Sequence, residues 1–129
     1  MRLLLDTHAL LWALAVPDRL STSARRHIAD RANELVVSAA SAWEIGTKVR
    51  IGRLPHAVPL VKNYTRLVGQ LGATALPMHQ EHALFAGTLD WNHRDPFDRM
   101  LAAQAVLENA TLVTIDPVFG AMKAVRTLW

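Results

Sequence analysis

The sequence contains no cysteine, and this absence removes several classes of chemistry at once. Disulfide bonds, thiolate zinc sites and a cysteine nucleophile are all excluded. A chain without cysteine also suits a reducing compartment, so we expect a cytoplasmic protein.

Long apolar runs are missing as well. No stretch approaches the roughly 20 apolar residues of a membrane helix, so we expect no membrane association. The first 15 residues superficially resemble a signal peptide, because leucines follow Met1 and Arg2. Asp6, Thr7 and His8 interrupt that apolar run, and cleavage after Ala15 would delete a predicted core strand. We therefore reject the signal peptide.

The composition is that of an ordinary compact protein, with 51% hydrophobic and 19% charged residues. A chain of 129 residues suits one domain, and we expect a single domain over residues 1–129. The net charge of +3 comes from 14 basic and 11 acidic residues. A modest positive charge suits a polyanionic substrate, but it fits an ordinary solubilising surface equally well.

Short apolar segments alternate with longer helical segments along the chain. We predict strands at 3–5, 35–37, 73–76 and 112–115, with a terminal strand across 125–128. We predict helices at 7–14, 21–33, 38–51, 59–70, 79–87 and 96–109. This alternation indicates an α/β protein, a three-layer α/β/α sandwich with a central parallel sheet.

Two acidic residues directly follow predicted strands. Asp6 ends the run Leu3–Leu5, and Asp116 ends the run 112–115. Ligands of open α/β sheets bind at the carboxyl ends of the strands, and Mg²⁺ prefers carboxylate oxygens. Each residue alone reads equally as a helix N-cap, which is a common role for aspartate. If the two strands are neighbours, however, their carboxylates share one edge.

Two further acids belong to predicted helices. Glu44 lies well inside the helix for which Ser38 is the expected cap, beside its apolar face, where a carboxylate needs a partner. In the segment around Pro96, Asp95 is the natural N-cap and Asp98 occupies the first turn. Asp98 alone would serve the helix dipole. Four converging carboxylates would repel one another by roughly 4 kcal/mol per close pair, so they would recruit metal or take up protons.

The four acids stand in segments that resemble a known family. These segments are Leu3–His8, Val37–Ile45, Asp95–Arg99 and Leu112–Asp116, and together they span nearly the whole chain. They are similar to the PIN-domain ribonucleases, and most similar to the VapC-type toxins of bacterial toxin–antitoxin pairs. Each motif is weak by itself, but four in this order are strong.

The resemblance implies an Mg²⁺- or Mn²⁺-dependent endoribonuclease whose products carry a 5′-phosphate and a 3′-hydroxyl. It implies that Asp6, Glu44, Asp98 and Asp116 bind the metal and that Asp98, rather than Asp95, belongs to the site. It also implies a homodimer and a VapB-type antitoxin that blocks the site.

Four nearby residues are supporting candidates. Thr7 and Thr114 sit where family members carry a hydroxyl, while Arg94 and Arg99 flank the predicted site. The two arginines would either contact phosphate or remain solvated charges at a helix end.

Other interpretations stay open or weak. A receiver domain of two-component signalling needs an acidic pair after the first strand, whereas Thr7 follows Asp6. Zinc bound by the pair His79 and His82 lacks an evident carboxylate ligand in the sequence. A non-catalytic binding module on the same fold, and a DNA substrate, are not excluded by the residues. The four tryptophans are expected mostly in the core, with one or two available for a partner surface.

Overall fold

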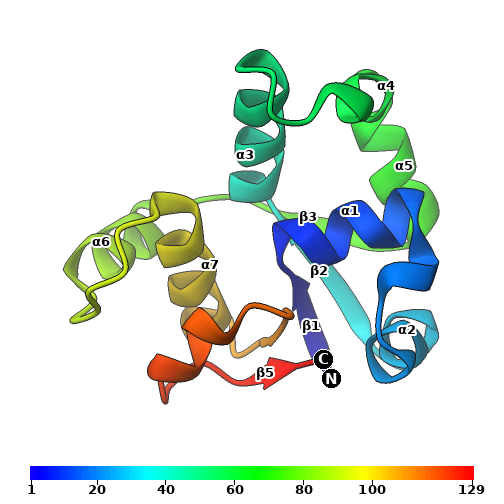
Figure 1. Cartoon of the computed structure of the whole chain (residues 1–129). Coiled ribbons are helices and arrows are strands. Elements are labelled where there is room, and N and C mark those ends of the chain that lie inside the picture. Colours follow the sequence, from blue (N-terminus) through cyan, green and yellow to red (C-terminus); the bar gives the residue numbers. More distant parts are fainter.

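The computed structural model describes all residues from 1 to 129 and contains one parallel sheet of five strands (Figure 1). The strands are β1 (Arg2–Leu5), β2 (Glu34–Ser38), β3 (Ala73–Leu76), β4 (Thr111–Val113) and β5 (Thr127–Leu128). Their order in the sheet is β3-β2-β1-β4-β5. The short strand β1 is therefore central, with β2 and β4 on its two sides. This order differs from the 2-1-3-4-5 order of receiver domains.

Helices cover both faces of the sheet. They are α1 (Thr7–Ala15), α2 (Thr22–Ala29), α3 (Ala39–Arg50), α4 (Val58–Lys62), α5 (Tyr64–Leu71), α6 (Gln80–Thr88) and α7 (Pro96–Leu107). Three short 3₁₀ helices lie at η1 (Pro17–Arg19), η2 (Pro55–Ala57) and η3 (Pro117–Ala121). The predicted α/β/α sandwich is confirmed.

The alternation of side chains along the strands divides the core in two. Leu3 and Leu5 of β1 pack with residues from α1 to α5, whereas Leu4 packs with α7 and η3 on the opposite face. All three leucines are fully buried. Successive strand side chains point to opposite faces, so a continuous apolar strand is what a sheet covered on both sides requires.

Most predicted elements are confirmed, and the differences have local causes. The predicted helix 59–70 is interrupted at Asn63, whose side-chain amide donates to the Pro59 carbonyl at 2.8 Å. The predicted helix 21–33 ends at Ala29, before a turn. Strand β4 stops at Val113, two residues earlier than expected, and Ile115 is exposed. The terminal strand is limited to Thr127 and Leu128.

Two further features of the fold are the turn into β3 and the character of the helices. Gly72 adopts a φ of 79° after α5, which lets the chain turn directly into β3. None of the helices combines the length and the apolar character needed to cross a lipid bilayer.

Candidate metal centre

Asp6 and Asp116 are brought together by the pairing of β1 with β4. Leu5 and Val113 are partners in the register, so the two strands end side by side and each carboxylate lies just beyond its strand. Asp6 is buried and accepts a hydrogen bond at Oδ1 from the Ala9 amide at 2.7 Å. Asp116 is exposed and accepts from the Val118 amide at 2.9 Å. Both residues are N-caps, as the capping interpretation predicted, and they also share one edge of the sheet.

Thr114 connects these two acids. Its side chain is buried, and its hydroxyl oxygen accepts from the Asp116 amide at 3.0 Å. Burial raises the pKa of Asp6, whereas the Thr114 hydroxyl and the Ala9 amide lower it in part; the nearby charge of Asp116 raises it further. The residue predicted to support the site therefore lies between two of its acids.

Glu44 projects from α3 and is already engaged by two residues of the chain. The buried hydroxyl of Thr7 donates to Oε1 at 2.5 Å, and the ammonium of Lys48 pairs with Oε2. Thr7 also lies 3.1 Å from the Ser41 hydroxyl. Lys48 stands one helical turn after Glu44, at a spacing that places both side chains on the same face of α3. The partner that a carboxylate beside an apolar face requires is thus Lys48.

Asp98 lies in the first turn of α7, immediately after the cap. Asp95 caps the helix by accepting from the amides of Phe97 and Asp98, at 2.9 and 3.2 Å. Asp98 Oδ2 instead accepts from His93 Nε2 at 2.7 Å. Burial raises the pKa of Asp98 and the bond from His93 lowers it, while the charges of Asp95 and Glu44 raise it. The division of roles between the two aspartates agrees with this geometry.

Arg99 behaves differently from either expectation. Its guanidinium neither faces solvent as a free charge nor remains available to phosphate, because it donates to four backbone carbonyls at 2.7 to 3.0 Å. The acceptors belong to Ala86, Leu89, Trp91 and His93. Arg94 is exposed and makes no hydrogen bond or ion pair within the chain.

The four acids lie on the same side of the molecule, because Thr7, the residue after Asp6, donates to Glu44. Asp6 and Asp116 interact with each other, as do Glu44 and Asp98. No three acidic or histidine side chains converge as a ready-made metal site. The donor set is nevertheless made entirely of carboxylate oxygens, with burial disfavouring the charge on Asp6 and Asp98, and this chemistry fits a hard divalent cation.

The histidine pair considered for zinc is used inside the fold. His82 is buried, its Nδ1 accepts from the His79 amide at 3.0 Å, and its Nε2 lies 2.9 Å from Glu108 Oε1. The sequence did not indicate that Glu108 reaches this histidine. Both ring nitrogens of His82 have protein partners.

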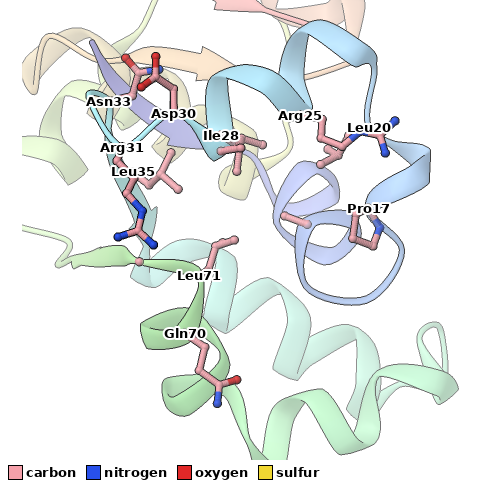
Figure 2. A pocket seen from close by; sticks show the side chains of 13 residues that line it. Pro17, Leu20, Arg25, Ile28, Asp30, Arg31, Asn33, Leu35, Gln70 and Leu71 are labelled. Carbon is pink, nitrogen blue, oxygen red and sulfur yellow. The ribbon is translucent and has the colours of Figure 1, made fainter.

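None of the four acids lines a cavity of about 570 Å³, and Figure 2 shows the side chains that do line it. It is lined by α1, α2, the start of β2 and the end of α5, near the amino ends of the strands. Leu35 and Leu71 form part of its apolar wall, and Arg25 and Arg31 contribute charge. None of the predicted site residues lines it.

Three residues near the acids were missed by sequence reasoning. Lys48 was detectable, because a basic residue four positions after Glu44 is a recognised helix pairing. His93 lies in a segment without regular structure, and no periodicity signals its contact with Asp98. Ser41, which lies beside Thr7, was not among the predicted site residues.

Comparison with known proteins places this geometry in a family. The model of the PIN domain matches residues 3–125. Over 122 residues the chain is 33% identical to Ribonuclease VapC22 of Mycobacterium tuberculosis, covering 88% of this chain and 85% of that protein.

Solved structures with the same fold are similar over almost the whole length. VapBC2 from Rickettsia felis, bound to a DNA fragment from its promoter, matches with a TM-score of 0.72 at 18% identity, covering 99% of this chain and 98% of that one. DNA-bound VapBC from Salmonella typhimurium matches with a TM-score of 0.70 at 15% identity, covering 99% and 97%. The extent of the domain match and the identity to VapC22 together show that this chain belongs to the PIN-domain family, among the VapC-type proteins.

Proposed function

We propose that this protein is a divalent-metal-dependent endoribonuclease that acts as the toxin of a toxin–antitoxin pair. The observation that carries the proposal is the meeting of Asp6 and Asp116 at the ends of two paired strands, with Glu44 and Asp98 on the same side. The 33% identity to a ribonuclease supports RNA as the substrate. An RNA substrate in turn suits action in the cytoplasm.

The metal that fits these residues is Mg²⁺ or Mn²⁺, held by Asp6, Asp98 and Asp116 with assistance from Glu44. A bound cation of this kind lowers the pKa of a water molecule and stabilises charge on the phosphoryl oxygens. The chain's own residues would orient and hold the carboxylates. Thr114 and the Ala9 amide hold Asp6, Thr7 and Lys48 hold Glu44, and His93 holds Asp98.

Cleavage of RNA by protein freed of any partner tests the proposal. Wild type should cut RNA with Mg²⁺ or Mn²⁺ and stop when EDTA is added, leaving a 5′-phosphate and a 3′-hydroxyl. Asp98→Asn should reduce kcat by roughly 10²-fold or more, because a lost metal ligand removes several kcal/mol of transition-state stabilisation. Asp95→Asn is the matched control, since asparagine keeps the cap and Asp95 lies outside the site.

The same assay separates the competing functions. Cleavage of single-stranded DNA at the rate for RNA would replace the RNA assignment with a broader nuclease. Tight RNA binding without metal-dependent turnover would instead support a non-catalytic binding module. Equal loss of activity in Asp95→Asn and Asp98→Asn would contradict the choice of Asp98.

We also propose that the protein forms a homodimer through an apolar groove between α3, α6 and α7. The groove has a volume of about 230 Å³ and is lined by Trp43, Met78, Phe97 and Met100 among others. Trp43 is 58% exposed and meets the Phe97 ring edge-on at 4.9 Å. A large aromatic residue exposed on an apolar surface is typical of a protein interface.

A VapB-type antitoxin is the second proposed partner. Solved neighbours from several bacteria are VapBC complexes, which supports a partner of this class for the present chain. Co-expression with the product of an adjacent short reading frame should yield a stable complex whose RNA cleavage is inhibited. A complex that cleaves RNA as fast as the free protein would contradict inhibition at the site.

A further inference from the structure

We propose that Arg99 and His93 are positioning residues for Asp98. Arg99 fixes the segment between α6 and α7, and His93, carried by that segment, holds one oxygen of Asp98 so that the other remains available to the cation. This inference rests on the proposed metal-dependent function. It assigns to Arg99 a role other than phosphate contact.

Arg99 binds the segment through the full set of its side-chain nitrogens. Nε donates to Ala86 at 2.9 Å, Nη2 donates to Leu89 at 2.7 Å, and Nη1 donates to both Trp91 and His93 at 2.7 and 3.0 Å. Residues 89–95 have no regular secondary structure, so the carbonyls of Leu89, Trp91 and His93 have no helix or strand partners, and Ala86 lies in the last turn of α6. Only the planar fork of a guanidinium can satisfy four such acceptors from one side chain.

Trp91 adds a second anchor to the same segment. Its ring packs against the core residue Phe119 at a centroid distance of 5.8 Å and against the His93 ring at 4.9 Å. The His93 backbone is therefore held through its carbonyl, and its ring packs against the tilted ring of Trp91. In this position Nε2 points to Asp98.

Asp98 is the acceptor that this arrangement reaches. Because an ionised carboxylate cannot donate, the proton in the 2.7 Å contact belongs to His93 Nε2. Oδ1 of Asp98 accepts no hydrogen bond from the chain, and the Asp95 cap fixes the backbone of the same turn. One oxygen is thus held while the other is left for a ligand. Such outer partners orient ligating carboxylates in metal sites.

The experiment measures Mn²⁺ binding by calorimetry, using full-length protein freed of any partner, alongside RNA cleavage and thermal unfolding. His93→Phe keeps a ring beside Trp91 but removes the donor. It should weaken Mn²⁺ binding roughly 10–100-fold and lower kcat similarly, with KM for RNA and Tm in EDTA near wild type. His93→Gln, which restores a donor, should recover part of the loss. His56→Phe, at an exposed histidine of η2, is the matched control.

Arg99→Lys tests the other half of the proposal. Lysine keeps the charge but offers a single ammonium in place of the fork, so Mn²⁺ binding should weaken in the same direction as in His93→Phe. This variant should also have a lower Tm, because several backbone carbonyls lose their hydrogen-bond donor. Arg66→Lys, at an exposed arginine whose side chain makes no hydrogen bond or ion pair, should change neither measurement.

Each outcome decides the proposal. Mn²⁺ binding within twofold of wild type in His93→Phe would overturn the role of His93, and an Arg99→Lys variant that loses Tm but binds Mn²⁺ normally would reduce Arg99 to a structural residue. No Mn²⁺ binding by wild type would also overturn the proposal. Wild type that binds Mn²⁺ but cleaves no RNA would contradict the ribonuclease function alone, because the positioning is read from binding.

Discussion

The carboxylate of Asp6 serves the backbone and the proposed site at the same time. Its Oδ1 caps α1 while burial raises its pKa, so the ionised side chain is held where its charge is unfavourable. A side chain that is kept charged in a buried position lowers the stability of the folded state. Function and stability are therefore opposed at this residue.

Asp6→Asn should stabilise the metal-free protein at pH 7. Asparagine caps a helix about as well as aspartate but carries no charge, so the cap survives and the unfavourable charge disappears. For a domain of this size each kcal/mol gained raises Tm by roughly 4 °C. Thermal unfolding in EDTA measures the change, and Asp6→Ala, which also loses the cap, should gain less. A lower Tm for Asp6→Asn than for wild type would contradict the argument.

The raised pKa of Asp6 also predicts how its effect on the stability of the folded protein varies with pH. Because the folded-state pKa of Asp6 is raised above its unfolded value, the folded protein binds more protons than the unfolded chain between these two values. Stability from this group is therefore present at low pH and falls as pH rises through that window. In urea titrations with EDTA, the stability difference between Asp6→Asn and wild type should shrink as pH falls from 7 toward 4. A stability difference that does not change with pH would arise from packing and not from the charge of Asp6.

Residue-level prediction from sequence reached the acids and their caps but not all of their partners. The sequence identifies three caps, because a cap is recognised from the residues next to it: each follows a strand or precedes a helix. These caps are Asp6, Asp95 and Asp116. The contact between His93 and Asp98 depends on how the intervening turn is folded. The conformation of this turn, which Arg99 holds, produces no periodic pattern in the sequence.

At the scale of elements, the junction of β2 and α3 is fixed by a buried polar contact. The hydroxyl of Ser38 accepts from the Ala40 amide as the N-cap of α3 and donates to Gln104 of α7 at 2.5 Å. Gln104 is fully buried and also donates to the Pro77 carbonyl at 3.1 Å. This residue ties together the helices that carry Glu44 and Asp98.

Gln104→Leu should therefore destabilise the protein although leucine is apolar and similar in size. The substitution leaves the Pro77 carbonyl and the Ser38 hydroxyl without these partners, at a cost of roughly 2–3 kcal/mol. Urea unfolding measures the loss, and Gln70→Leu, at an exposed glutamine of α5, is the control. Stability equal to wild type would mean that water or a neighbouring group replaces both bonds.

Element boundaries were predictable where a cap or a glycine marks them. Ser21 and Ser38 both act as N-caps by accepting from Ala24 and Ala40, and serine is a preferred residue at this position. Neither the break at Asn63 nor the early end of β4 is marked by a glycine or by a predicted cap. At Asn63 the helix stops where the side-chain amide bonds to the Pro59 carbonyl, a local contact that the apolar pattern of the sequence did not indicate.

At the scale of the whole molecule, the proposed dimer gives a test of the apolar groove. Trp43→Ala removes the most exposed aromatic group of that surface and should weaken self-association by roughly 30-fold, as expected for a central interface tryptophan. Analytical ultracentrifugation across a concentration series measures the change. Leu107→Ala, at an exposed leucine outside the groove, should leave self-association unchanged.

Two different results would contradict the proposed dimer. A wild-type protein that stays monomeric at high concentration would reject the homodimer itself. A Trp43→Ala variant that associates like wild type would show that two copies meet through another surface. The sequence foresaw that one or two tryptophans could serve a partner, but it could not identify which, because exposure depends on the packing of α3 against α7.

The pairing of β1 with β4 has a consequence for the synthesis of the protein. Asp6 is made well before Asp116, yet the two residues meet at adjacent strand ends. A nascent chain therefore carries no complete set of carboxylates until β4 has emerged and inserted beside β1. A chain whose synthesis has not yet passed Asp116 therefore cannot contain the assembled centre.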